Sequence, residues 1–99
     1  MDSSIHRSIQ EGFRLLQTGN PEAAIPYLTS VANLYPVTNE VIEAMRLAGI
    51  AFRRMLNLEA STRCLKDSLR EARRLKKPEL EALAMEELVA TAQAKILIR

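Results

Sequence analysis

The sequence predicts an all-α protein, and three observations lead to this prediction. The chain of 99 residues contains only 3 Gly, 2 Tyr, 2 Phe and no Trp, whereas β-sandwiches and barrels are usually richer in turn, β-branched and aromatic residues. No segment alternates apolar and polar residues for long enough to form a strand. Residues that start and stop helices divide the chain into five segments of helical length. The length itself is that of one domain.

Capping residues mark the first two predicted helices. Ser3 or Ser4 caps the first, which is expected to end near Gly19, because glycine suits the left-handed turn that often follows a helix. Asn20 and Pro21 form an N-cap and a first-turn proline, so the second helix is predicted to begin there.

The other boundaries also follow from local signals. The second helix is expected to run to about residue 34, and Pro26 inside it is expected to kink it or delay its start. Thr38 opens a third helix that ends near residue 56, Asn57 caps a fourth that runs to about residue 76, and Pro78 opens a fifth that runs to about residue 97. The third is apolar around most of its circumference, which predicts that it is the central, most buried helix. Because the connections are short, successive helices are expected to be antiparallel neighbours.

Charge and cysteine content narrow the class of protein. The net charge is only +2, but residues 53–77 carry nine of the 14 Lys and Arg and three of the 12 Asp and Glu. The single cysteine, Cys64, excludes an internal disulfide and fits a reducing compartment. No apolar run approaches the roughly 18 residues of a membrane span, and the N-terminus lacks the basic and apolar segments of a signal peptide. A cytoplasmic protein without a membrane span is therefore expected.

The strongest pattern in the chain is an internal repeat. Shifting the sequence by 37 residues aligns Ser8, Glu11, Gly12, Leu15, Ala24, Leu28 and Val31 with Met45, Ala48, Gly49, Phe52, Ser61, Leu65 and Ser68. In each half a glycine on one helix lets a second helix approach closely, and large apolar residues one turn away fill the space around the contact.

This pattern resembles the tetratricopeptide repeat (TPR), a helix pair of about 34 residues. A first unit, about residues 5–38, matches the family at Gly12, Leu15, Gly19, Ala24, Leu28 and Pro36, although Ser8 and Glu11 stand where the family prefers Trp and Leu. A second unit, about residues 42–75, keeps Gly49, Phe52 and Leu65, and the terminal helix at about 78–97 resembles the start of a third unit. The resemblance implies that residues 1–99 form a single domain, an antiparallel helix-pair solenoid.

The TPR resemblance also implies a function in protein–protein interaction, because family members bind peptides or helices in a groove lined by the first helix of each unit. Carried over by position, the groove residues are Ile9, Phe13, Leu16, Gln17, Arg46, Ile50, Arg53 and Arg54. An apolar groove edged by arginines suits an amphipathic helix with some acidic residues. The alternative is that the third or fifth helix of the same chain covers these apolar side chains.

The fifth predicted helix is unusually apolar for the end of a solenoid, which needs a polar outer face. We predict an association surface there, made of Leu88, Val89, Ile96 and Leu97. Two and a half units also fall short of the roughly three that such stacks need, so a second copy or an obligate partner is expected. The alternative is that the last residues fold back onto the core.

A basic face on the fourth helix has two interpretations. Arg63, Lys66, Arg70, Arg73 and Lys77 recur at three- and four-residue spacing. They could contact nucleic acid or an acidic partner. The favoured interpretation is a solvated face that Asp67, Glu71 and the acids of the fifth helix compensate. No aromatic residue interleaves the basic ones, and no helix-turn-helix or zinc spacing is present, so nucleic-acid binding is not expected.

No catalytic residue, metal site or cofactor is predicted. His6 is the only histidine, Cys64 is typical of a small buried residue, and the chain has no glycine-rich phosphate loop. The predicted function is that of a small adaptor or chaperone, not an enzyme, which binds an amphipathic helix or peptide of a client protein. The alternatives are a self-assembling structural module and a nucleic-acid-binding helical protein that uses residues 63–77.

Overall fold

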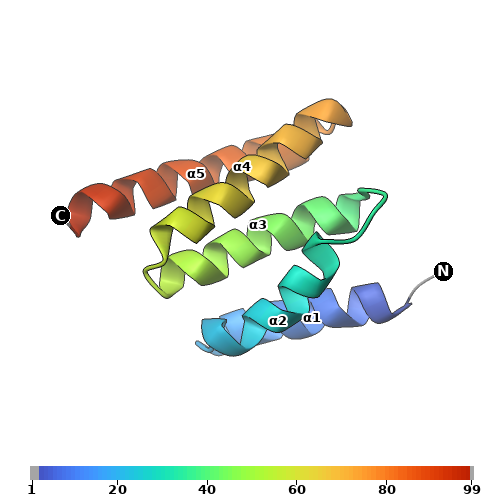
Figure 1. Ribbon diagram of the computed structural model, residues 1–99, viewed down its shortest axis with the longest axis horizontal. Coiled ribbons are helices and arrows are strands. Elements are labelled where there is room, and N and C mark those ends of the chain that lie inside the picture. Colours follow the sequence, from blue (N-terminus) through green and yellow to red (C-terminus); the bar gives the residue numbers. More distant parts are fainter. Residues whose placement is uncertain (1–2, 99) are drawn as a thin grey trace.

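The structure is a computed structural model that describes residues 3–98, and this part of the chain folds into five α-helices. They are α1 (Ser3–Gln17), α2 (Pro21–Ala32), α3 (Asn39–Arg54), α4 (Leu58–Arg74) and α5 (Pro78–Leu97). The chain reverses direction at each turn, and successive helices pack side by side (Figure 1). The prediction of an all-α domain with five helices is therefore confirmed.

α2, α3 and α4 begin where the capping residues predict. The side chains of Asn20, Thr38 and Asn57 each accept a hydrogen bond from the backbone N–H three residues later, at 3.3, 3.3 and 3.2 Å. α1 begins at Ser3, so Ser3 and Ser4 lie within the helix and the prediction that one of them is its N-cap is wrong. α2 begins at Pro21 and continues through Pro26, so the proline does not delay the start of the helix.

The first, third and fourth turns share one backbone conformation. Gly19, Leu56 and Lys76 have φ angles of 82°, 62° and 58°, which lie in the left-handed region. Each turn is closed by the same two backbone hydrogen bonds: Gly19 N to Leu16 O and Asn20 N to Leu15 O, Leu56 N to Arg53 O and Asn57 N to Phe52 O, and Lys76 N to Arg73 O and Lys77 N to Ala72 O. The turn begins before the left-handed residue, which explains why α3 and α4 each end two residues earlier than predicted.

The centre of the molecule is α3. It contacts each of the other four helices, whereas α1 contacts only α2 and α3, and α5 contacts only α3 and α4. Its apolar circumference fits this position, because side chains on several of its faces are buried. The prediction that the third helix is the most buried is confirmed.

One glycine in each helix pair sets the distance between the two helices: Gly12 between α1 and α2, and Gly49 between α3 and α4. A Cβ atom at Gly12 would lie 2.6 Å from Cγ of Leu28 on α2, and one at Gly49 would lie 2.6 Å from Cγ of Leu65 on α4. Both leucines are fully buried. Gly12 and Gly49 are therefore required for the close approach of α1 to α2 and of α3 to α4.

Candidate protein-interaction surfaces

The apolar residues assigned to the groove differ in their exposure. Leu16 and Ile50 are only 4% and 9% exposed and belong to one core cluster with Leu28 and Leu47. Their assignment to a partner-binding groove is therefore corrected, because helices of the same chain cover them. Ile9 is half-buried against the core, and Phe13 is 47% exposed.

Two of the three groove arginines already have partners within the chain. The guanidinium of Arg53 forms an ion pair with Glu87 at 2.7 Å and also donates to the Thr91 hydroxyl at 3.3 Å. Arg54 donates to the backbone carbonyl of Leu16 at 2.7 Å. These two side chains tie α3 to α5 and to α1, a structural role that the sequence analysis did not predict.

Arg46 and Gln17 are the remaining polar members of the predicted groove. Gln17 is exposed at the end of α1. Arg46 lies 3.8 Å from Glu43, and its buried Nε atom has no hydrogen-bond partner. The surface left on this side of the molecule is Phe13, Gln17, Arg46 and the exposed part of Ile9, which is much smaller than the sequence predicted.

A buried polar cluster holds α5 in place, and the sequence analysis did not identify it. The hydroxyl groups of Ser61 on α4 and Thr91 on α5 lie 3.0 Å apart, and both residues are buried. Arg53 on α3 contacts the same threonine and the carboxylate of Glu87. Because every polar group in this cluster finds a partner, it fixes the rotation of α5 about its own axis.

That rotation leaves much of the apolar surface of α5 uncovered. Val89, Ile96 and Leu97 are 51%, 68% and 82% exposed, whereas Leu88 is half-buried. Ile96 and Leu97 do not fold back onto the core, so this alternative is excluded in the described structure.

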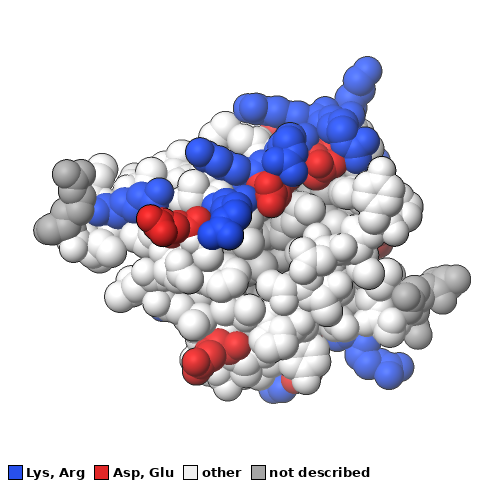
Figure 2. All heavy atoms as spheres, viewed as in Figure 1, with Lys and Arg blue, Asp and Glu red and all other residues white. Residues whose placement is uncertain are grey.

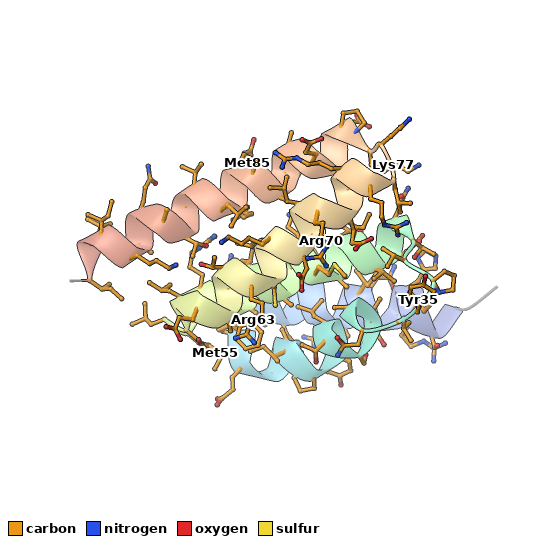
Figure 3. All side chains as sticks on the ribbon, turned by 45° about the horizontal axis from the view of Figure 1, so that its top comes forward. Tyr35, Met55, Arg63, Arg70, Lys77 and Met85 are labelled. Carbon is orange, nitrogen blue, oxygen red and sulfur yellow. The ribbon has the colours of Figure 1, made fainter. Side chains whose placement is uncertain are left out.

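Five exposed residues on α5 form a continuous apolar line, which we call the α5 stripe. It consists of Ala82, Met85, Val89, Ala92 and Ile96. The spacing alternates between three and four residues, so the five side chains share one face of the helix. Met85 lies on α5 at the edge of the molecule (Figure 3). A shallow depression lined by Ala82, Met85, Glu86 and Val89 lies along the first half of the stripe. The sequence analysis included Val89 and Ile96 in its association surface but not Ala82, Met85 or Ala92.

The residues that line this depression are equivalent, in the 37-residue repeat, to residues of α1 and α3 that lie where α2 and α4 pack. Residues 82, 85, 86 and 89 lie 37 residues after Met45, Ala48, Gly49 and Phe52 of α3, and 74 after Ser8, Glu11, Gly12 and Leu15 of α1. α2 packs on α1, and α4 packs on α3, through the glycines at positions 12 and 49. Among the described residues, no helix packs on α5 in the corresponding way.

Hydrogen bonds support this correspondence between helices. Arg54 on α3 binds the carbonyl of Leu16 on α1, and Arg53 on α3 binds Thr91 on α5. Moving the first pair forward by 37 residues gives the positions of the second pair, although the donor side chain is then on the other member of the pair. α5 is therefore placed against α3 in the same register as α3 is placed against α1.

The basic face of α4 is partly neutralised. Arg63 and Arg70 lie on the outer side of α4, Lys77 lies in the turn after it (Figure 3), and acidic side chains lie among the basic ones (Figure 2). Ion pairs join Arg70 to Asp67 (2.9 Å) and Glu71 (3.4 Å), Arg74 to Glu71 (2.7 Å) and Arg73 to Glu81 (2.8 Å). The hydrogen bond from Arg74 lowers the pKa of Glu71 below its usual value. The predicted compensation by Asp67, Glu71 and an acid of α5 is present.

The described residues hold no group of acidic, histidine or cysteine side chains that could bind a metal ion. Burial raises the pKa of the half-buried Cys64 thiol, which disfavours the thiolate form. His6 is exposed and lies 4.0 Å from Glu40. No helix between residues 3 and 98 is long and apolar enough to cross a membrane.

Comparisons with protein-family models, with curated proteins and with solved structures find no match to this chain.

Proposed function

We propose that this protein is a helical protein-interaction module that binds an amphipathic helix of a partner protein. One observation carries the proposal: the α5 stripe is an uncovered apolar line at the position where α2 and α4 cover the corresponding faces of α1 and α3. A helix of the partner would occupy this position. Val89 and Ile96 of the stripe are 51% and 68% exposed, and contiguous exposed apolar residues mark interaction sites.

The arrangement of helix pairs supports a TPR-like stack. The turns at Gly19 and Leu56 have the same hydrogen bonds 37 residues apart, and so do the close contacts at Gly12 and Gly49. We therefore assign residues 5–38 and 42–75 to two units and the terminal helix to the first half of a third. In such a stack the last exposed helix is the natural place for a further helix to add.

The proposed site of client binding is α5 rather than the groove. Leu16 and Ile50 are in the core, and Arg53 and Arg54 are bound within the chain. The depression on α5 is mainly apolar and contains one carboxylate, that of Glu86. The client helix would therefore present apolar residues at three- and four-residue spacing with a basic residue facing Glu86. As an adaptor or chaperone, the protein would shield this apolar line of its client from water.

The test is affinity capture from the protein's native cells, with the wild type and two matched variants. Met85→Lys combined with Val89→Lys should abolish capture of the client, because the charges would be desolvated in the contact. Phe13→Asp, on the predicted groove, should leave capture unchanged. Circular dichroism establishes that each variant is folded. Capture that survives the double substitution, or is lost only with Phe13→Asp, would overturn the assignment to α5.

A further inference from the structure

We infer that a cluster of cations on α4 binds an acidic helix of a partner protein. The cluster, which we call the α4 cation cluster, consists of the basic residues between positions 63 and 77, and all seven are exposed: Arg63, Lys66, Arg70, Arg73, Arg74, Lys76 and Lys77. This inference goes beyond the proposed function, because it concerns a surface other than the α5 stripe and a partner of different chemistry. A protein with two such surfaces can join two partners, as an adaptor does.

The α4 cation cluster concentrates positive charge that the rest of the chain lacks. Residues 63–77 hold 7 of the 14 Lys and Arg but only 2 of the 12 Asp and Glu, so this segment carries +5, whereas the other residues, with 7 basic and 10 acidic side chains, carry −3. The cationic side chains gather over α4 and the turn that follows it (Figure 2). Three of the seven are engaged in the ion pairs described above. Within residues 3–98, no ion pair engages the other four, which are Arg63, Lys66, Lys76 and Lys77.

The turn after α4 contains two lysines that the fold does not favour. Lys76 has a φ of 58°, in the left-handed region where glycine is preferred, as at Gly19. Lys77 is the N-cap of α5, and its side chain makes no capping hydrogen bond, whereas the caps of α2, α3 and α4 do. A positive charge at the start of a helix also opposes the helix dipole. Residues that depart from local preference in this way are typical of functional positions.

Along α4 itself, the cluster forms a row of like charges. Four of its members follow one another at spacings of three, four and three residues, so they share one face of the helix over about 15 Å: Arg63, Lys66, Arg70 and Arg73. Like charges at these spacings destabilise a helix, so the row does not serve the stability of α4. Asp67 and Glu71 each follow a member of the row by one residue, about 100° around the helix, and therefore border the row on one side.

The carboxylates beside the row favour an acidic helix over other anionic partners. A nucleic-acid duplex or an anionic membrane presents phosphates over a wide surface, which would lie over Asp67 and Glu71 as well as over the cations. A helix can present one row of carboxylates at the same three- and four-residue spacing and place basic residues beside it, opposite Asp67 and Glu71. The arginines of the row suit this partner, because a guanidinium binds a carboxylate through two parallel hydrogen bonds. No aromatic residue occurs between positions 58 and 77, so unpaired bases would find no residue on which to stack.

Fluorescence anisotropy with two labelled helical peptides tests the inference. In the first peptide, four glutamates form a row at alternating three- and four-residue spacing. In the second, which has the same composition, they are distributed around the helix. At low ionic strength, where exposed charges are least screened, the wild type should bind the row peptide about fivefold or more tightly than the other. Equal binding of the two peptides, or no binding of the row peptide, would overturn the inference.

Two matched double variants locate the contact. Arg63→Gln with Lys66→Gln removes two cations that have no ion pair within the described structure, and it should weaken binding of the row peptide by about threefold to tenfold. Arg7→Gln with Lys95→Gln is the control, because it removes the same net charge from exposed positions on α1 and α5, and binding should stay within about twofold of the wild type. Equal weakening by the two variants would overturn the inference, because net charge alone would then explain binding.

Two further measurements separate this role from its alternatives. Thermal unfolding of Arg63→Gln with Lys66→Gln should show an unchanged or higher Tm, because like-charge neighbours on α4 are removed. A markedly lower Tm would show that these cations serve the fold and would contradict the inference. A short DNA duplex, or phosphatidylserine vesicles, can replace the peptide. Either of them, if bound more tightly than the row peptide and released by the same two substitutions, would assign the α4 cation cluster to nucleic acid or to a membrane and overturn the acidic helix.

Discussion

Replacement of Gly49 by alanine separates two opposing contributions to stability. In an isolated helix, alanine is favoured over glycine by about 1 kcal/mol, so propensity alone predicts a more stable protein. In this structure the added Cβ would lie 2.6 Å from Cγ of Leu65 and 3.3 Å from the backbone oxygen of Ser61. Carbon atoms in contact normally lie about 3.5–4.0 Å apart, so α3 and α4 would have to separate by roughly 1 Å.

The expected net effect is a loss of stability. Leu65 is fully buried, so it cannot turn out into solvent to relieve the overlap. Overpacking of this kind costs about 1–3 kcal/mol, and the large overlap places the cost in the upper half of that range. After the gain in helix propensity, Gly49→Ala should lower the free energy of unfolding by about 1–2 kcal/mol, which corresponds to a decrease in Tm of about 5–15 °C.

The change in the free energy of unfolding can be measured by thermal and urea unfolding followed by circular dichroism. The control is the same substitution made in a Leu65→Ala variant. In a Leu65→Ala variant the added Cβ has room, so Gly49→Ala should become stabilising by about 0.5–1 kcal/mol. The sign of the effect should therefore reverse between the two backgrounds. An increase in Tm on Gly49→Ala in the wild type would refute the claim that glycine sets the α3–α4 distance.

Leu56→Gly should raise the free energy of unfolding by about 1 kcal/mol. Leu56 has a φ of 62°, which disfavours a residue with a side chain, and its side chain is 65% exposed, so little packing is lost. A lower Tm in thermal unfolding would contradict this prediction. Arg53→Met and Glu87→Gln should show a coupling of about 1–2 kcal/mol in a double-mutant cycle, and additive losses would argue against their ion pair. Glu71 has a pKa held below its ordinary value of 4.5 by the guanidinium of Arg74, so its contribution to stability is present above pH 4.5 and lost as the pH falls through the lower folded value. Urea unfolding of the wild type and of Glu71→Gln should converge toward acid pH, and a gap that stays constant would show that the ion pair is not stabilising.

Local signals were sufficient to predict the helices. Asn20, Thr38 and Asn57 cap the helices that they were expected to cap, because an N-cap depends on a side chain and on the backbone three residues away. The turns at Leu56 and Lys76 carried a weaker signal. In all three turns with a left-handed residue the helix ends two residues before that residue, whereas the sequence analysis placed the helix end at the residue itself.

Local sequence signals could not predict which residues form the interaction surface. An apolar residue such as Leu16 or Ile50 fits both a groove and a core, and only the packing of helices that are distant in sequence decides between them. Arg53 pairs with a residue 34 positions later, so its partner depends on how α5 crosses α3. The apolar character of α5 was evident from composition, but the rotation that exposes Val89 depends on the buried Ser61–Thr91 contact.

The central position of α3 has a consequence for communication within the molecule. Among the described helices, the backbones of α1 and α2 do not come close to those of α4 and α5, whereas α3 lies close to all four. An influence of a ligand bound at one end on the other would therefore act mainly through α3, by a shift of this helix or by a change in its mobility.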